Sequence, residues 1–341
     1  MIDERSVMEK KRDVTIDIAK GIGIYLVCLG HTTSNEVVLK WLYSFHMPLF
    51  FFLSGIFHSQ TEKYLEFFKK KVRALLVPYL FFATTLFIFF LLVSKKIGFS
   101  AGENLPVKEN FIGIFIGTEI KNFSRVSWGG QLWFLLALFL VANIMYFVKK
   151  LSLKTQILVN VLMILTNIYL SKKIDFYLPW CFLTVLMAFN FYWFGNYFRN
   201  DILNRKNISN LVLLGLLIIN LIISHLNGKV DMWSNSYGNL ILFFIGAYSG
   251  SLFLIFFIKK FILNNKFLEY IGKNSLVILA YHKRGITIIK VVFIYILKMS
   301  IPEGNTIFDL IFSLIEILLC IPIIVVLNKY FPFFIGKGKK K

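Results

Sequence analysis

The sequence has few charged residues, and acidic residues are the rarest of them. Asp, Glu, Lys and Arg together make up 16% of the 341 residues, whereas a soluble domain has about 25%. Hydrophobic residues reach 57% and include 38 phenylalanines, too many for a soluble core of this size. This composition excludes an ordinary soluble domain and indicates a polytopic membrane protein.

Cysteine is scarce as well, and the few cysteines do not form a metal-binding pattern. Cys28, Cys181 and Cys320 all lie inside apolar stretches without metal-ligand spacing, so we expect packing residues and no metal. The net charge of +20 does not point to nucleic acid, because the lysines lie in short loops between apolar segments, where they orient a membrane protein. We expect the C-terminal GKGKKK to contact lipid headgroups.

Ten apolar segments approach the roughly 20 residues that a membrane-spanning helix needs. The segments are 14–34, 43–58, 75–94, 131–148, 155–171, 179–198, 209–226, 239–258, 275–297 and 307–327. The longest connection, 95–130, contains an apolar piece at 111–117 that we expect to be interfacial or re-entrant. The sequence therefore predicts one all-α transmembrane bundle over residues 1–341, with no soluble domain of useful size.

The distribution of basic residues predicts the orientation of the bundle. Loops on the side of the N-terminus carry more than twice as many Lys and Arg residues as loops on the other side, which places both termini in the cytoplasm. The charged N-terminus is followed by a long apolar helix without a small-residue cleavage site. We expect a signal-anchor-like first helix and not a cleaved signal peptide.

Two ionisable residues, Lys20 and His31, lie in the first apolar segment. Eleven residues at about 100° each bring their side chains to one helical face, about 16 Å apart along the axis. Asp17 lies near that face, one turn before Lys20. A charge within a membrane segment costs about 2.5–3.5 kcal/mol on insertion scales and usually has a function. This face is therefore a candidate wall of a buried reaction chamber.

Two further motifs follow closely. His46 lies two residues before Pro48 near the outer end of the second apolar segment, where a solvated and a functional histidine are equally compatible with the sequence. The stretch KKKVRALLVPY, at 69–79, is a basic cluster at a helix entrance. It fits contact with anionic lipid and also a phosphate-binding patch, in which Arg73 is best suited to phosphate.

A third polar cluster, His282-Lys283-Arg284, lies within a late apolar segment. Three consecutive titratable side chains cannot all face lipid, so the helix either lines an aqueous cavity or breaks at Gly285. The two basic residues fit an anionic acceptor, such as a polyprenyl-diphosphate-linked sugar or an acidic polysaccharide unit. The alternative is pairing with Glu316 or Asp309.

Five tryptophans lie near the predicted ends of the membrane segments. They are Trp128, Trp133, Trp180, Trp193 and Trp233. Anchoring at the membrane interface is the usual role of such residues. Trp128 and Trp233 are also suited to stacking on a sugar, and Glu119, Arg125 and Asp231 are weaker candidates in the same outer loops.

Three stretches carry a resemblance to a known family. IDIAKGIGIYLVCLGH, SFHMPLFFFLSG and KVRALLVPY, in this order and spacing, resemble the start of the acyltransferase 3 family of integral membrane acyltransferases. Later stretches, among them YGNLILFFIGAYSGS and IGKNSLVILAYH, are similar to the branch with fucose O-acetylase-like and surface-polysaccharide O-acetyltransferases. The resemblance covers almost the whole chain. Many members have Arg where this chain has Lys20, so the charge is kept and the planar fork of Arg is lost.

The resemblance implies an O-acetyltransferase that moves an acetyl group from cytoplasmic acetyl-CoA to a sugar hydroxyl of a cell-surface polysaccharide or its lipid-linked precursor. For such a transfer we expect catalysis by His31, Lys20 and His282, and binding of the CoA phosphates by Lys20, Lys71 and Arg73. We expect His46, Arg284 and Trp128 to bind the glycan or glycolipid acceptor, although Lys283 and Arg284 are less typical of the family. Histidine suits the base that such a transfer needs at neutral pH.

Two other functions remain compatible with the sequence. A polar stripe within a membrane also fits a transporter or flippase of a charged glycan lipid, although the halves show no inverted symmetry. A scaffold for polysaccharide assembly is disfavoured by the buried His and Lys. Richness in Lys, Ile, Asn and Phe indicates a bacterial genome of high AT content, and hence a multi-pass protein of the bacterial plasma membrane.

Overall fold

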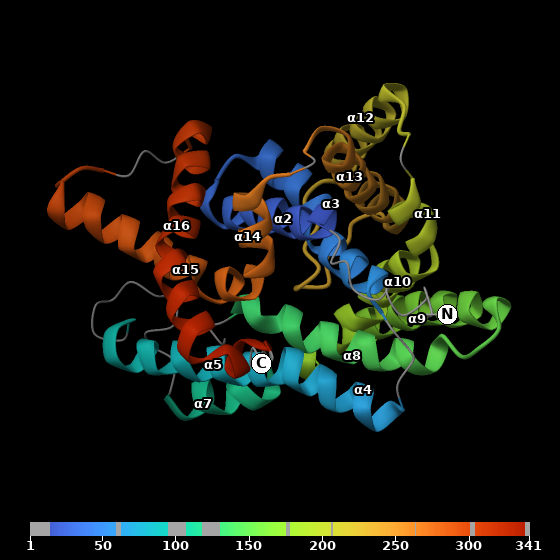
Figure 1. The fold of residues 1–341 in the computed structure, drawn as a ribbon, viewed down its shortest axis with the longest axis horizontal. Helices are drawn as coiled ribbons and strands as arrows, with labels where there is room; N and C mark the ends of the chain where they lie inside the picture. Colours follow the sequence, from blue (N-terminus) through green and yellow to red (C-terminus); the bar gives the residue numbers. More distant parts are fainter. Residues whose placement is uncertain are drawn as a thin grey trace, which may run out of the picture.

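The computed structural model describes eight stretches of the chain. They are residues 14–58, 63–94, 107–117, 130–174, 178–205, 207–262, 264–300 and 304–337. These stretches are helical throughout (Figure 1), apart from short connections and one isolated β-bridge between Asp231 and Ser236. The prediction of an all-α, polytopic helical bundle is confirmed.

Eight of the described helices are long and apolar enough to cross a membrane. They are α2 (Val14–Thr32), α3 (Glu36–Ile56), the run Tyr64–Leu92, the run Gly130–Val148, α9 (Leu153–Lys173), α12 (Asn210–Asn227), α13 (Leu240–Phe261) and α16 (Thr306–Tyr330). The two remaining predicted spans are also helical, as α10 (Phe182–Tyr197) and as α15 (Ser275–Val291) extended by η5 (Val292–Ile296). The α10 helix is short, with 16 residues after the non-helical Trp180, and the helix formed by α15 and η5 carries three charged residues, Lys283, Arg284 and Lys290.

The longest run combines four elements. They are α4 (Tyr64–Lys71), η1 (Val72–Leu76), α5 (Val77–Phe89) and η2 (Phe90–Ser94). This helix begins 11 residues before the predicted start at residue 75. Pro78 follows the wide π-turn η1, and such a turn accommodates a residue that has no backbone N–H. The basic cluster is therefore helical and leads directly into the membrane segment.

The second helix also begins earlier than predicted. It starts at Glu36 and not at residue 43, because the side chain of Asn35 accepts hydrogen bonds from the backbone N–H groups of Val37 and Val38 and so caps the helix. The apolar piece at 111–117 belongs to α7 (Val107–Ile116), whose 10 residues extend for about 15 Å and cannot span a bilayer. Tyr79 on α5 donates a hydrogen bond of 2.7 Å to the Ile114 carbonyl, so α7 packs against the bundle.

Glycines let the helices around the site approach at backbone distance. A Cβ at Gly21 or Gly272 would collide with the backbone of the partner helix where α2 crosses the short helix α14 (Lys266–Lys273). Gly55 on α3 and Gly195 on α10 are opposed in the same way. Small residues at such crossings are the usual means of tight helix packing in membranes. They hold α2 and α3 in fixed positions.

The helices divide into central and peripheral ones. Buried residues make up 78% of the membrane window of the Gly130–Val148 run, which contains η3 (Gly130–Leu132) and α8 (Trp133–Val148), and 67% of that of α2. The corresponding shares are 11% for α9 and 17% for α12, whose exposed leucines and isoleucines suit contact with lipid. In Figure 1, α2 and α3 lie in the middle of the view, with α15 and α16 on one side and α12 and α13 on the other. The central helices build the site.

The remaining short elements lie at the helix ends. They are η4 (Pro179–Cys181), α11 (Arg199–Asn204) and η6 (Pro332–Ile335). The C-terminal element η6 packs back onto the bundle, where Phe334 stacks on Phe81 with ring centroids 5.1 Å apart. The end of the described chain thereby lies against α5.

Candidate functional site

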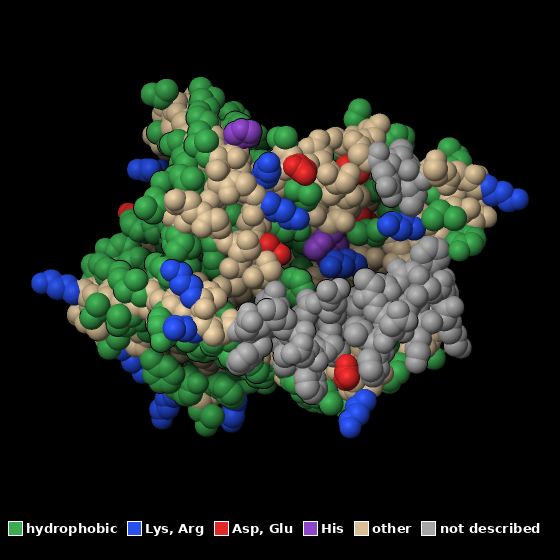
Figure 2. Space-filling view, turned by 180° about the vertical axis from the view of Figure 1, so that it is seen from behind, with side chains coloured by type: hydrophobic (Ala, Val, Ile, Leu, Met, Phe, Trp, Pro, Cys, Tyr) green, Lys and Arg blue, Asp and Glu red, His purple; other side chains and the backbone are tan. Residues whose placement is uncertain are grey.

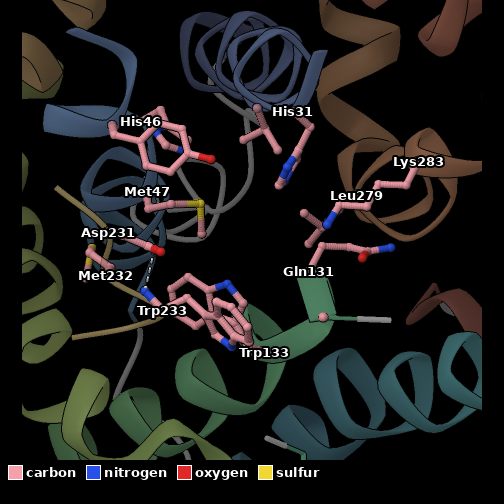
Figure 3. A pocket seen from close by; sticks show the side chains of 13 residues that line it. His31, His46, Met47, Gln131, Trp133, Asp231, Met232, Trp233, Leu279 and Lys283 are labelled. Atoms are coloured by element: carbon pink, nitrogen blue, oxygen red, sulfur yellow. Dashed lines mark hydrogen bonds between the residues drawn. The ribbon is translucent and has the colours of Figure 1, made fainter. Parts of the chain in front are cut away.

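A cavity of about 230 Å³ lies among α2, α3, α15, the start of α8 and the loop between α12 and α13. Figure 3 shows the side chains that line it, including His31 from α2 and His46 from α3. Trp133 and Trp233 form an aromatic wall, and Gln131 and Asp231 add polar groups. In the space-filling view of Figure 2, a histidine and basic and acidic side chains gather in the middle of the face, and hydrophobic side chains cover much of its left side. We call this space the histidine cavity.

His31 and His282 come together beside the histidine cavity. Their ring centroids are 5.2 Å apart, with an angle of 31° between the planes. The side chain of His31 is exposed to the cavity, whereas that of His282 is fully buried. The two residues are far apart in sequence, so only the packing of α2 against α15 makes them a pair.

The hydrogen bonds of His282 assign its tautomer. Its Nδ1 lies 3.0 Å from the carbonyl oxygens of Ile278 and of Leu279. A carbonyl only accepts, so Nδ1 carries the proton and Nε2 keeps its lone pair. This Nε2 is buried and has no hydrogen-bond partner in the described part of the chain. His282 thus adds an unused acceptor next to His31.

His46 is held in the same way on the neighbouring helix. Its Nδ1 donates to the carbonyl of Leu42 over 2.6 Å, which leaves Nε2 as an acceptor. The ring of Tyr43 contacts it edge-on, with centroids 4.8 Å apart. Of the two readings that the sequence left for His46, the solvated one does not hold, because its side chain is buried at the cavity wall.

The two basic residues that follow His282, Lys283 and Arg284, point in different directions. Lys283 lines the histidine cavity, whereas the guanidinium of Arg284 lies over the ring of Phe89 on α5, 5.4 Å from its centroid. Neighbouring residues on a helix point about 100° apart, which explains the separation. Helix α15 continues past Gly285 and Lys283 lines a cavity, so of the two alternatives that the sequence left open, the helix lines a cavity and does not break.

A second cavity of about 230 Å³ lies on the other side of His31, between α2, α15 and α16. The carboxylates of Glu316 and Asp309 line it, and they accept hydrogen bonds of 2.6 Å from Thr32 and 2.7 Å from Thr33. These carboxylates therefore hold the end of α2. His31 is shared by both cavities.

A narrow apolar cavity adjoins the histidine cavity. Val27, Met47 and Leu279 line both spaces, and Ile24 lines only the narrow one. Lys20, Ile24, Val27 and His31 follow one another at steps of four, three and four residues, which places them on one face of α2. The predicted polar face thus runs from Lys20 past the narrow cavity to His31.

Aromatic rings bring Lys20 and Lys71 to the same end of the bundle. The ammonium of Lys20 lies 5.5 Å from the ring centroid of Phe57, and that of Lys71 lies 5.2 Å from the ring centroid of Phe67. His58, next to Phe57, packs on Phe67 at 5.3 Å. Burial, together with the positive charges of Lys71 and Lys149, lowers the pKa of His58 to about 3. This end of the site carries a positive potential, and sequence reasoning did not identify His58.

The other predicted residues lie apart from this group. Arg73 donates a hydrogen bond of 3.4 Å to the Lys337 carbonyl, and its guanidinium stacks 5.3 Å from the Phe333 centroid. Arg73 thus contacts the C-terminal segment. Trp128, Glu119 and Arg125 lie outside the described residues.

Hydrogen bonds fix the positions of two further residues of the cavity, Gln131 and Asp231. Gln131, which sequence reasoning missed, begins the α8 run and donates from Nε2 to the Ala280 carbonyl over 2.8 Å. Asp231 accepts a 3.0 Å hydrogen bond from the Trp233 N–H, the pattern of an Asx-turn. Among the described residues, no three His, Cys, Asp or Glu side chains lie close enough together to hold a metal ion.

The fold and the site define a membrane protein with a polar chamber centred on a histidine pair. Residues 13–327 match the family model described as "Acyltransferase domain". The chain therefore belongs to the acyltransferase 3 family, as the motifs of the first helices predicted.

One curated relative shares part of the chain. The nodulation protein NolL of Sinorhizobium fredii (strain NBRC 101917 / NGR234) is 33% identical over 149 residues, which are 39% of this chain and 36% of that protein. The chain thus matches about a third of the length of this relative. No solved structure matches the chain.

Proposed function

We propose that the protein transfers an acetyl group from cytoplasmic acetyl-CoA to a hydroxyl of a cell-surface polysaccharide or of its lipid-linked precursor, in the manner of the fucose O-acetylase-like branch of the family. The observation that carries this proposal is the face of α2 that joins Lys20, the narrow apolar cavity and His31. It offers a charged donor site and a base on one helix.

The donor end is the end with Lys20 and Lys71. CoA carries several phosphates, which need cations, and the excess of basic residues in the loops on this side supports a cytoplasmic position. Arg73 belongs to the same basic cluster in the sequence, but its guanidinium contacts the C-terminal segment, so it would reach a phosphate only from the edge of this end. From here the thin arm of CoA passes Ile24 and Val27, whose apolar side chains suit it. The thioester then reaches His31, about 16 Å along the helix axis at 1.5 Å per residue.

The transfer step uses His31 as the base. The acceptor hydroxyl gives its proton to the imidazole of His31, and its oxygen forms a bond to the thioester carbonyl carbon. The carbon–sulfur bond then breaks, and the CoA thiolate leaves and takes up the proton from the imidazolium. The buried Nε2 lone pair of His282 stabilises the positive charge that His31 carries in between.

The acceptor occupies the wide part of the histidine cavity. Aromatic side chains with a polar edge are suited to sugar rings, which have apolar faces and polar rims. Trp133 and Trp233 provide such surfaces, and His46 and Asp231 provide polar contacts. Trp128, outside the described residues, and Arg284, which lies over Phe89, stay candidates for acceptor binding from the sequence alone.

Mass spectrometry of the surface glycan tests the proposal. Cells that produce the protein should have a glycan that is heavier by one or more acetyl groups than that of cells without it. A glycan of unchanged mass, together with export or translocation that depends on the protein, would favour a transporter or flippase, which leaves the thioester intact.

A further inference from the structure

Lys283 lines the histidine cavity, and no carboxylate of the described residues forms an ion pair with it. Lys283 lines this cavity together with His31. No residue of the described stretches forms a hydrogen bond or an ion pair with it. Removing a cation from water without giving it a negatively charged partner costs free energy. An anionic ligand would supply that partner to Lys283.

Asp231 attracts Lys283 across the cavity but is not in direct contact with it. Asp231 lines the same cavity, but its Oδ1 accepts a 3.0 Å hydrogen bond from the Trp233 N–H within its own loop. Figure 3 shows Asp231 and Lys283 on opposite sides of the cavity. Lys229, on the same loop as Asp231, is a further cation near this cavity and lies 4.9 Å from the ring centroid of Tyr43.

The carboxylates of α16 do not neutralise Lys283 either. Glu316 and Asp309 line the second cavity, where Thr32 and Thr33 donate hydrogen bonds to them. Neither carboxylate lines the histidine cavity. The side of the histidine cavity formed by α15 therefore keeps a positive charge next to the base.

We propose that the acceptor is acidic and that Lys283 binds its carboxylate or phosphate. The inference rests on the proposed function and narrows its acceptor to a class. The shared chemistry is an oxyanion close to the reacting hydroxyl, from an acidic sugar such as a uronic acid or from the diphosphate that links a sugar to its lipid. The sugar ring lies against Trp133 and Trp233, and the anion on Lys283 directs a neighbouring hydroxyl toward His31.

Binding measurements without acetyl transfer test this inference. The full-length protein, purified in detergent, is titrated calorimetrically with sodium glucuronate, with glucose as its neutral counterpart, and with inorganic diphosphate. The variants are Lys283→Met, Lys283→Arg, and Lys40→Met as a matched control. Lys40 lies on α3 beside Glu36, at 3.9 Å, and lines neither cavity.

We expect one of the two anions to bind the wild-type protein at least about tenfold more tightly than glucose, because a charged partner strengthens a hydrogen bond. Lys283→Met should bind that anion no better than glucose, whereas Lys283→Arg and Lys40→Met should retain the preference. Preference for glucuronate assigns the charge to the sugar, and preference for diphosphate assigns it to the lipid linker.

Two results would overturn the inference. One is binding of both anions no tighter than glucose, and the other is anion binding that survives in Lys283→Met and so occurs elsewhere, for example at Lys20. Thermal unfolding of each variant shows whether it is folded. If Lys283→Met does not fold, Lys283→Arg still tests whether a positive charge at this position is enough for the preference for the anion. These outcomes are separate from the proposed function, because a protein that acetylates a neutral glycan would fail here and still transfer the label from acetyl-CoA.

Discussion

His282 lies 5.2 Å from His31, ring centroid to ring centroid, and its Nδ1 donates to the backbone of its own helix. These backbone hydrogen bonds fix the orientation and the tautomer of the buried ring, so that Nε2 keeps its lone pair as an acceptor beside His31. The exposed ring of His31 touches both cavities. We therefore regard His31 as the base and His282 as the residue that positions and supports it.

Replacing His282 should slow the transfer step and leave donor binding intact. For His282→Phe, we expect kcat to fall about tenfold to hundredfold, less than the full loss expected for a general base, with KM for acetyl-CoA within about twofold of wild type. His282→Asn can still donate to the helix carbonyls and should lose less. A rise in KM with an unchanged kcat would contradict this role.

Replacing Lys20 should weaken the binding of acetyl-CoA, because in the proposed donor site only the phosphates contact this residue. For Lys20→Met, we expect KM for acetyl-CoA to rise about tenfold, which corresponds to the loss of one charge-assisted contact. Acetyl-pantetheine has the thioester without the phosphates and should be used equally well by both proteins. Lys329→Met, at the end of α16 and outside all three cavities, is the control. An equal loss with both donors would place Lys20 elsewhere in the mechanism.

The close crossing of α2 and α14 should not tolerate a larger side chain. A Cβ at Gly272 would collide with the Asp17 carbonyl, so Gly272→Leu should destabilise the protein by at least about 2 kcal/mol. Gly215 on α12 has no atoms within 4 Å of the corresponding position, so Gly215→Leu should change stability little. Thermal unfolding in detergent compares the two, and equal midpoints would show that the crossing is looser than described.

His58 should make the protein sensitive to acid. Burial holds its folded-state pKa at about 3, below the usual 6.5. The unfolded state therefore binds the proton first, and stability is lost as the pH falls from about 6.5 toward 3, by up to about 1.4 kcal/mol per pH unit. His58→Gln can keep the 2.9 Å hydrogen bond with Tyr192 without titrating. Between pH 7.5 and pH 5, its midpoint should fall less than that of the wild type, and parallel losses would contradict the assignment.

Local patterns were sufficient to predict the class, most helices and the polar face of α2. Apolar runs of membrane length and the helical period fix where a helix lies and which of its residues share a face. Lys20 and His31 were placed correctly on one face for this reason. Helix starts were less accurate, because the cap at Asn35 and the π-turn before Pro78 depend on local hydrogen bonding.

Tertiary packing determined what the sequence left open. The pairing of His31 with His282 depends on how α2 packs against α15, and the sequence does not encode that crossing locally. The same packing directs Lys283 into the cavity and Arg284 onto Phe89, although the two are neighbours. The contact of Arg73 with the C-terminal segment arises from residues more than 250 positions away.

Acetyl transfer by His31→Ala tests the central claim most directly. The protein, its His31→Ala variant and the control His225→Ala, which changes an exposed histidine on α12, are placed in membranes with radiolabelled acetyl-CoA and the surface glycan. We predict that wild type and His225→Ala label the glycan equally, and that His31→Ala is inserted at the same level but leaves the glycan unlabelled. Labelling by His31→Ala at the wild-type rate would contradict the account.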